Sequence, residues 1–224
     1  ELSKTGIGGN WGTFINNKKI TKCDLTGVTD WGRTPTLPDA AFSNCTALQE
    51  VTLPDDMKVI GTGAFFGCAA LTTVNLSQVT WINLNAFWGC ISLETLALDN
   101  VTAIGQEAFY GCTGLETLKI PKCTEFGTYI VSGCRSLTRI EATAAGNFVD
   151  ISDGRSSIER TAVFHNRDSH YGDSAFNPAK CDLVLNADKK QGGNATPKVF
   201  SDNEWLMMPN GQLMRWNSIT FAQQ

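Results

Sequence analysis

The sequence predicts a β-dominated solenoid, in which coils of about 22 residues stack through short parallel strands. The first observation is a period: five of the eight cysteines recur at intervals of 23, 22, 22 and 22 residues, at positions 45, 68, 90, 112 and 134. The second is an apolar pattern that follows each of these cysteines with the same period. A unit of this length is too short to bury its own apolar face, so it must stack on copies of itself.

Each unit contains a strand after its cysteine, with the pattern C-x-x-L-x-x-Z-x-Z, in which Z is an apolar residue. Because side chains alternate along a strand, Val51 and Leu53 should point into the core while Glu50 and Thr52 point outward. The equivalent inward pairs of later units are Val74 and Leu76, Leu96 and Leu98, Leu118 and Ile120, and Ile140 and Ala142. In-register stacking about 4.8 Å apart then predicts one parallel strand face along the solenoid.

A second apolar column lies eight residues before each cysteine and predicts the opposite wall of the solenoid. This column contains Leu37, Ile60, Ile82, Ile104 and Phe126. Gly61, Gly105 and Gly127 follow three of these residues, and we expect them at tight corners where positive φ excludes a Cβ atom. The motif before each cysteine, for example Ala86-Phe87-Trp88-Gly89, is expected to form a short 3₁₀ or helical corner.

The period divides one continuous domain into three parts. These are an N-terminal cap with a divergent first coil at 1–36, repeats of about 22 residues at 37–142, and an insertion, a last degenerate repeat and a C-terminal cap at 143–224. The divergent coil is indicated by Val28–Gly32, which is similar to Val101–Gly105. This alignment starts the coil near residue 20 and places an insertion around Arg33 to Pro38.

Beyond the regular units, the period fails at Thr143, and a polar insertion continues to about Asp173. Ala175-Phe176, followed by Cys181–Leu185, then predicts one last degenerate repeat. The aromatic tail from Trp205 to Phe221 is expected to close the C-terminal end, because the end of a solenoid exposes a strand edge and an open core.

Several positions agree over four or five consecutive units, as in the segment VTAIGQEAFYGCTGLETLKIP from Val101 to Pro121. This pattern resembles the BspA-like leucine-rich repeats of bacterial cell-surface proteins, abundant in Bacteroides-type bacteria, over about residues 37 to 142. The resemblance implies an α/β leucine-rich-repeat solenoid with a right-handed superhelix and export from the cell. It also implies a non-enzymatic function in adhesion to host proteins or to other cells.

The composition narrows the class of partner. The chain has 18 basic and 22 acidic residues, a net charge of −4 and a pI near 5.2, without a run of Lys or Arg. These values disfavour nucleic acid and anionic membranes as partners. No apolar stretch approaches the ~20 residues of a transmembrane helix, and the chain opens on Glu-Leu-Ser-Lys rather than on a leader, so we expect a soluble, mature or trimmed protein.

The cysteine ladder predicts buried, reduced thiols rather than disulfides or a metal site. Stacked cysteines point the same way about 4.8 Å apart, whereas a disulfide needs facing Cβ atoms about 3.8 Å apart. Zinc ligands usually come in local pairs, and the sequence contains no C-x-x-C. Cys23, Cys123 and Cys181 lie outside the ladder, and Cys123 shares the column of Val79 and Val101, so it should lie in the core.

Other candidate chemistry lacks a complete set of groups. His165 and His170 flank an aspartate, but nothing upstream supplies the further ligands that zinc needs. The segment from Asp150 to Gly154 departs from the spacing of a calcium loop, and the sequence contains no nucleophile elbow for a hydrolase. We therefore expect no metal, no cofactor and no enzymatic activity.

Two surfaces could contact a partner. On the strand face, the candidate residues are Thr73, Thr95, Thr117 and Arg139 in one column and Asn75 and Lys119 in the next. A flat polar sheet suits a protein or a glycan held by many small contacts, although ordinary solvated strands have the same composition. At the corners, Phe66, Trp88 and Tyr110 occupy one position of successive units and either contact a ligand or pack on one another.

The expected function is that of a secreted or cell-surface binding module, on the exterior of the outer membrane, that adheres to host matrix or cell-surface proteins. A lipid anchor in the precursor and a monomeric state are part of this expectation. The alternative is a glycan-binding accessory surface protein of a gut bacterium, which would use the aromatic residues at the corners.

Overall fold

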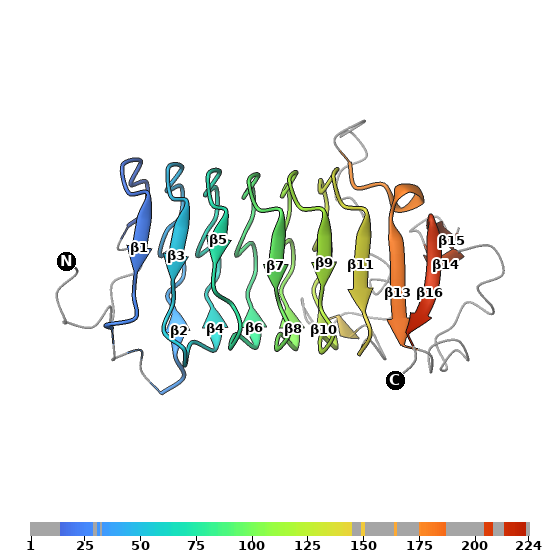
Figure 1. Cartoon of the computed structure of the whole chain (residues 1–224), viewed down its shortest axis with the longest axis horizontal. Helices are drawn as coiled ribbons and strands as arrows, with labels where there is room; N and C mark the ends of the chain where they lie inside the picture. Colours follow the sequence, from blue (N-terminus) through green and yellow to red (C-terminus); the bar gives the residue numbers. More distant parts are fainter. Residues whose placement is uncertain are drawn as a thin grey trace.

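The computed structural model describes residues 14–28, 31, 33–144, 149–150, 164, 175–186, 204–207 and 213–222. The chain winds into a row of coils, and most coils contribute one strand to a strand face and a shorter strand to a second wall (Figure 1). The predicted β-dominated solenoid of short parallel strands is therefore confirmed.

The strand face contains eight parallel strands. They are β1 (Lys22–Asp24), β3 (Glu50–Thr52), β5 (Thr73–Val74), β7 (Thr95–Ala97), β9 (Thr117–Lys119), β11 (Arg139–Ala142), β13 (Asp182–Asn186) and β16 (Ser218–Ala222). They form two sheets rather than the single face that the repeat predicts, with the orders β1-β3-β5 and β16-β13-β11-β9-β7. Within each sheet the predicted register holds, since Cys23 pairs with Val51 and Leu96 pairs with Leu118.

The second wall is one continuous parallel sheet, with the order β12-β10-β8-β6-β4-β2. Its strands are β2 (Thr36–Leu37), β4 (Val59–Ile60), β6 (Trp81–Ile82), β8 (Ala103–Ile104), β10 (Glu125–Phe126) and β12 (Val149–Asp150). The predicted column of Leu37, Ile60, Ile82, Ile104 and Phe126 is fully buried beneath this wall. An antiparallel pair, β14 (Glu204–Met207) and β15 (Leu213–Arg215), lies beside the last strands (Figure 1).

The core between the two walls is built from identical positions of successive coils. Val51, Leu53 and Leu118 are buried, as the alternation predicts, while Glu50 and Thr52 reach the surface. The phenylalanines of the corner motif form a stack with ring centroids 5.1 to 5.7 Å apart, which contains Phe14, Phe42, Phe65, Phe87 and Phe109. Each coil is therefore held mainly by contact with its two neighbours, as in other repeat proteins.

The corners are successive β-turns and not the 3₁₀ or helical turns that the sequence predicts. In one corner, the Phe66 N–H donates to the Gly63 carbonyl and the Cys68 N–H donates to the Phe65 carbonyl. This i to i−3 spacing is that of a 3₁₀ helix, but Gly63 and Gly67 both have positive φ, which a 3₁₀ helix does not tolerate. The short 3₁₀ helix η3 (Pro178–Lys180) is the helix that the described residues contain.

The glycines after the second-wall residues are required for a different reason from the one the sequence predicts. Positive φ occurs at Gly63, Gly67 and their equivalents rather than at Gly61 or Gly105. A Cβ atom on Gly61 would lie 2.5 Å from the Leu37 carbonyl oxygen, and one on Gly105 would lie 2.5 Å from the Leu84 nitrogen. These glycines therefore allow the backbones of neighbouring coils to approach each other.

This close approach predicts a large effect of a small substitution. We expect Gly105→Ala to lower the free energy of unfolding by about 3 kcal/mol, because the new methyl group meets backbone atoms that cannot move independently. Gly27→Ala is the matched control, since a Cβ atom there has no neighbour within 4 Å, and it should change stability by less than about 0.5 kcal/mol. Urea unfolding of both variants measures the difference, and equal midpoints would contradict the packing explanation.

The first coil begins earlier than predicted. Phe14 stacks on Phe42 and donates its N–H to the Ala41 carbonyl, so it occupies the corner position of a full coil rather than part of a cap. Asn16, with φ of 61°, takes the place of the glycine in the corner motif. The predicted alignment of Val28 with Val101 agrees with their equivalent turns, but the extra residues lie between Val28 and β2, upstream of the predicted position.

At the C-terminal end, β13 continues the ladder in register, with Arg139 opposite Asp182, and β16 pairs with β13. Trp216 is buried between Phe164 and Phe176, so part of the aromatic tail does pack on the end of the core. Most of the predicted insertion, including His165 and His170, lies outside the described residues. The described residues include no helix with the length and apolarity that a membrane crossing needs.

Candidate binding surfaces

The strand face brings one predicted column of candidate residues together, in two groups. Thr95 lies opposite Thr117, and Thr117 lies opposite Arg139, so these three form a row across β7, β9 and β11. Thr73 occupies the same position on β5, opposite Glu50, but in the other sheet. The side chains of Thr73 and Thr95 are exposed and that of Thr117 is half-buried, so the row of Thr73, Thr95 and Thr117 is small, polar and uncharged.

Asn75 differs from the other candidates because its side chain is already engaged. Its Oδ1 accepts a hydrogen bond from the Leu53 N–H at 2.6 Å, and its Nδ2 donates to the Leu53 carbonyl at 2.9 Å. The carboxamide thus pairs with the main chain of the preceding coil. A partner could reach it only by replacing both bonds, so we place Asn75 among the structural residues.

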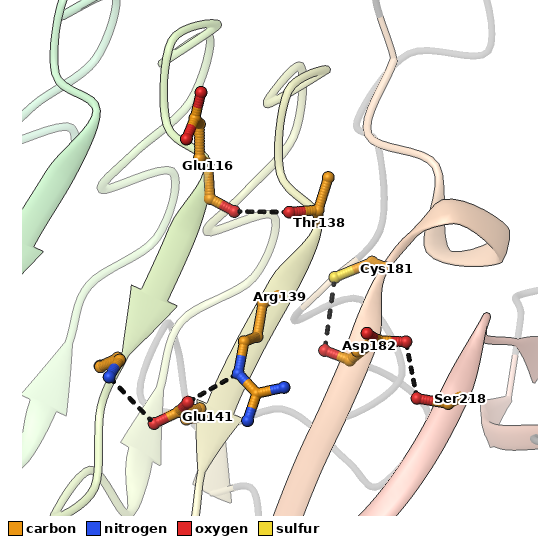
Figure 2. Close-up of polar contacts among 8 residues, drawn as sticks. Glu116, Thr138, Arg139, Glu141, Cys181, Asp182 and Ser218 are labelled. Atoms are coloured by element: carbon orange, nitrogen blue, oxygen red, sulfur yellow. Dashed lines mark hydrogen bonds and ion pairs between the residues drawn. The ribbon is translucent and has the colours of Figure 1, made fainter.

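A group of charged side chains lies beside the threonine row. Figure 2 shows Arg139 and Glu141 together on β11, where the Arg139 Nε donates to the Glu141 carboxylate at 2.7 Å. Lys119 approaches the same carboxylate at 3.7 Å. On β13, Asp182 accepts hydrogen bonds from Ser218 and Asn217.

These hydrogen bonds, first that from Ser218 and then that from Asn217, lower the pKa of the Asp182 carboxyl, and the nearby Arg139 contributes in the same direction. Asp182 therefore remains ionised at neutral pH and its orientation is fixed. Sequence reasoning missed Glu141 and Asp182 as site residues. Glu141 could have been found from its column, but the position of Asp182 depends on where the ladder resumes after the long insertion.

At the opposite end of the strand face, the Lys22 Nζ lies 2.7 Å from the Glu50 carboxylate. The uncharged row is thus bordered by paired charges at both ends. Exposed ion pairs contribute little stability, so their effect here is mainly on the electrostatic potential that an approaching partner meets.

The corner aromatic residues pack on one another, which was one of the two predicted possibilities. Phe66 and Trp88 stack with centroids 4.5 Å apart, and Trp88 and Tyr110 stack at 5.3 Å with nearly parallel rings. Both faces of the Trp88 ring are therefore covered, and Tyr110 is only 6% exposed. A sugar that stacks on an aromatic ring needs an open ring face, which Trp88 does not provide.

The large apolar side chains that are exposed lie elsewhere. Of the four in the described residues, Trp81, Leu84 and Ile91 belong to one coil, and their exposed fractions are 45%, 40% and 49%. Trp81 lies on the second wall between Val59 and Ala103. Sequence reasoning missed this group, although a comparison of columns would have found it, because the neighbouring coils carry smaller or polar residues there.

All eight cysteines are free and buried, as predicted for the five of the ladder and for Cys123. Each ladder thiol also makes a hydrogen bond that the sequence did not predict. Its Sγ donates to the carbonyl of a phenylalanine in the preceding coil at 2.9 to 3.1 Å, in the pairs Cys45 and Phe14, Cys68 and Phe42, Cys90 and Phe65, Cys112 and Phe87, and Cys134 and Phe109. Burial raises the pKa of Cys68 and of Cys112 to about 12, so these thiols are poor nucleophiles in the folded protein.

No group of three or more His, Cys, Asp or Glu side chains within the described residues is arranged to hold a metal ion. In this part of the chain, the surfaces that could act are the flat strand face and the exposed apolar side chains Trp81, Leu84 and Ile91 of one coil. Together with the stacked coils, they define the class as a solenoid repeat protein.

Comparison with known proteins gives the family. The profile of the BspA-type leucine-rich repeat region matches residues 13–153 in six copies. The chain therefore belongs to the BspA-type leucine-rich repeat family, and the resemblance stated from the sequence is confirmed. The match begins upstream of residue 20, in agreement with the coil that starts at Phe14. Leucine-rich-repeat proteins of this family are generally non-enzymatic, and the family supports protein binding.

Three solved structures are similar to this chain. A leucine-rich repeat protein of T. pallidum has a TM-score of 0.50 and 23% identity, over 60% of this chain and 70% of that one, which supports the fold. A leucine-rich cell-surface protein from Faecalibacterium prausnitzii is 30% identical, with a TM-score of 0.47, over 66% of this chain and 35% of that one. A Bacteroides ovatus leucine-rich repeat protein is 17% identical, with a TM-score of 0.28, over 79% and 58% respectively. No curated protein matches the sequence.

Proposed function

We propose that the protein is a non-enzymatic binding module that holds a protein partner on its strand face, with the row of Thr73, Thr95 and Thr117 at the centre of the contact. The observation that carries the proposal is the arrangement of this row, which is small, polar and uncharged between two groups of paired charges. Small exposed side chains allow a partner to approach the sheet closely. The charges at the ends favour one orientation of the partner over others.

The rigidity of the sheet supports the same proposal. Thr95, Thr117 and Arg139 lie on hydrogen-bonded strands. Their relative positions are therefore set before a partner binds. The protein itself then loses less conformational entropy in the complex than a mobile binding loop would. Many modest contacts over such a surface suit a protein more than a small molecule.

Two lysines on this row test the proposal. We expect the double variant Thr95→Lys, Thr117→Lys to weaken binding at least about tenfold, because adjacent long charged side chains keep a partner away from the sheet. Thr102→Lys, Thr124→Lys is the matched control: it adds two lysines at exposed threonines of adjacent coils, directly before the second-wall strands β8 and β10. The measurement is surface plasmon resonance against a panel of purified extracellular-matrix and plasma proteins. Equal losses for both variants, or no loss for the Thr95, Thr117 variant, would reject the strand face.

The location and the type of partner are further parts of the proposal. We infer a secreted or surface-exposed protein, on the outer membrane exterior, that adheres to host or other-cell proteins and acts as a monomer, with a lipid anchor as one means of attachment. Membership of the BspA-type family supports this inference. Protease treatment of intact cells tests it, since a surface protein is degraded while a cytoplasmic marker survives.

The glycan alternative has less support because Trp88 has no open ring face. The same variants separate the two functions. Soluble polysaccharides that quench tryptophan fluorescence equally in the wild type and in the Thr95, Thr117 lysine variant would indicate a glycan site away from the strand face. A response limited to matrix and plasma proteins would favour the protein partner.

A further inference from the structure

The strand face is interrupted between β5 and β7. A backbone hydrogen bond joins the start of each strand to the preceding coil, from Gln49 to Thr21, Thr72 to Gln49, Glu116 to Glu94, Thr138 to Glu116, and Asp182 to Thr138, at 2.7 to 3.1 Å. The equivalent bond, from the Glu94 N–H to the Thr72 carbonyl, is missing at this junction of the described residues. The two strands also belong to different sheets. We call the junction of residues 72–75 with residues 94–97 the seam.

Asn75 provides a local cause for the seam. In two other coils, the residue after the strand donates its N–H to a backbone carbonyl of the next coil, as Leu25 does to Thr52 and Ile120 does to Glu141. Leu53 instead donates to the Asn75 side chain, which also bonds the Leu53 carbonyl. The carboxamide thus takes the place of the Asn75 backbone. As a result, β5 ends at Val74, one residue shorter than β3.

The seam is confined to the strand face. On the second wall, the same two coils are joined by bonds from Thr80 and Trp81 to the Lys58 carbonyl. At the corner, the Gly67 N–H donates to the Trp88 carbonyl, and beyond the strands the Asn100 side chain donates to the Ser77 carbonyl. The coils are therefore linked around the seam, and any opening there does not require the solenoid to come apart.

Solvent reaches the core more easily at the seam than at the other strands. Val74 points inward from β5, as Val51 and Leu118 do from β3 and β9, and those two are at most 1% exposed. Val74 is only partly buried. Leu96, across the seam, is 8% exposed, whereas Leu118 and Ile140 in the same column are fully buried. At the seam, inter-strand backbone hydrogen bonds are thus missing and the apolar side chains beneath them are more exposed to solvent.

We propose that Asn75 divides the strand face into two plates, β1-β3-β5 and β7-β9-β11-β13-β16, that open locally at the seam while the second wall holds the coils together. Local opening has a low free energy where backbone hydrogen bonds are missing and apolar side chains are poorly covered. At the seam the bond from Glu94 to Thr72 is missing and Val74 is only partly buried. The proposal also explains why the two sheets meet at this junction, since Asn75 replaces the Thr52, Ala97 and Lys119 of other coils.

The seam also extends the proposed function, on which this consequence rests. Thr73 lies on one plate, and Thr95 and Thr117 lie on the other. A partner that contacts all three would span the seam and fix the relative position of the plates. The width of the binding surface is therefore adjustable at one point, while the row on the second plate stays rigid.

Hydrogen exchange of the free protein, followed by NMR, tests the seam without any partner. Glu94 and Glu116 form an internal comparison, because they are the same residue type, are both exposed, and occupy the same position of adjacent coils. The Glu116 N–H is bonded to the Glu94 carbonyl at 3.1 Å. We expect the Glu94 amide to exchange at least about 100-fold faster than the Glu116 amide. Similar rates for the two amides would overturn the proposal.

Two variants at the seam test the role of Asn75. We expect Asn75→Thr, which copies Thr52, to slow exchange of Glu94 at least about tenfold, because the main chain can then take the regular register. Asn75→Ala removes the carboxamide without adding a hydroxyl and should act in the same direction. If Glu94 stays unprotected in both folded variants, Asn75 is not the cause and the proposal fails.

An asparagine introduced on another strand tests the proposal even if the Asn75 variants do not fold. Lys119→Asn places the carboxamide one residue after the centre of β9, opposite Glu141, and should speed exchange of the Thr138 amide. No change at Thr138 would contradict the proposal. Because these measurements contain no partner, failure of the seam does not bear on binding to the threonine row, and failure of binding leaves the seam intact.

Discussion

The folded protein should lose its stability abruptly between pH 9 and pH 11, with a steeper pH dependence than a domain of this size usually shows. All eight cysteines are buried free thiols. Burial raises their pKa values above the ordinary 9.0, to about 11 for Cys23 and about 12 for Cys68, Cys112, Cys123 and Cys181. The unfolded chain therefore loses its thiol protons at a lower pH than the folded chain.

The sign of the effect follows from proton binding. Below pH 8, thiols are protonated in both states and the full stability is present. Above pH 9, the folded state binds more protons than the unfolded state, so the free energy of unfolding falls as pH rises toward the folded pKa values. Each of the four thiols with a pKa of about 12 contributes about 1 kcal/mol between pH 9 and pH 10, so these four together contribute about 4 kcal/mol, a large fraction of the total stability of a domain.

Urea unfolding from pH 7 to pH 10.5 measures this dependence. A Cys112→Ala variant is the control, because it lacks one buried thiol. The difference in bound protons between its folded and unfolded states should be smaller by about one, so its free energy of unfolding should fall less steeply with pH. Its stability at pH 7 should also be lower. Thiol counting at pH 8 gives an independent measure: the folded protein should react slowly and the unfolded protein should show all eight groups. Fast labelling of the folded protein, or fewer than eight groups after unfolding, would show that the thiols are not buried and free.

The parts of the fold that the sequence predicts are those whose residues face a copy of themselves. Leu96 faces Leu118 and Phe87 faces Phe109 because the same position recurs in each coil, so the period reveals both the strand and its partner. The role of Gly105 is less accessible, since a glycine needed for φ and one needed for close approach look alike in a sequence. The structure distinguishes them, because Gly105 has no positive φ and a Cβ atom on it would lie 2.5 Å from the Leu84 nitrogen.

The candidate site is less predictable because its outward residues have no repeated neighbour to restrict them. The period places Thr73 and Thr95 in one sheet, yet a single carboxamide, that of Asn75, separates them by changing the partner of Leu53. Asp182 joins Arg139 across a segment that has no period, so no offset in the sequence identifies the pair. For Trp88, the sequence left ligand contact and packing open, and the ring distances favour packing.

A single truncation at the centre of the phenylalanine stack should destabilise the fold more than the glycine substitution at the coil contact. Phe87 is fully buried and stacks on Phe65 at 5.1 Å and on Phe109 at 5.7 Å. We expect Phe87→Ala to lower the free energy of unfolding by about 4 kcal/mol, because it leaves a cavity between the rings of Phe65 and Phe109 in the two neighbouring coils. Urea unfolding followed by circular dichroism measures the loss.

Phe14→Ala is the control at the end of the same stack, where the ring is half-buried and its stacking partner is Phe42. Coils of a solenoid contact mainly their neighbours, so stability is a sum of coil and interface contributions. A central ring belongs to two interfaces and a terminal ring to one, and Phe14→Ala should therefore lose about half as much as Phe87→Ala. Equal losses would mean that the stack acts as one cooperative unit, in which the position of the missing ring no longer matters.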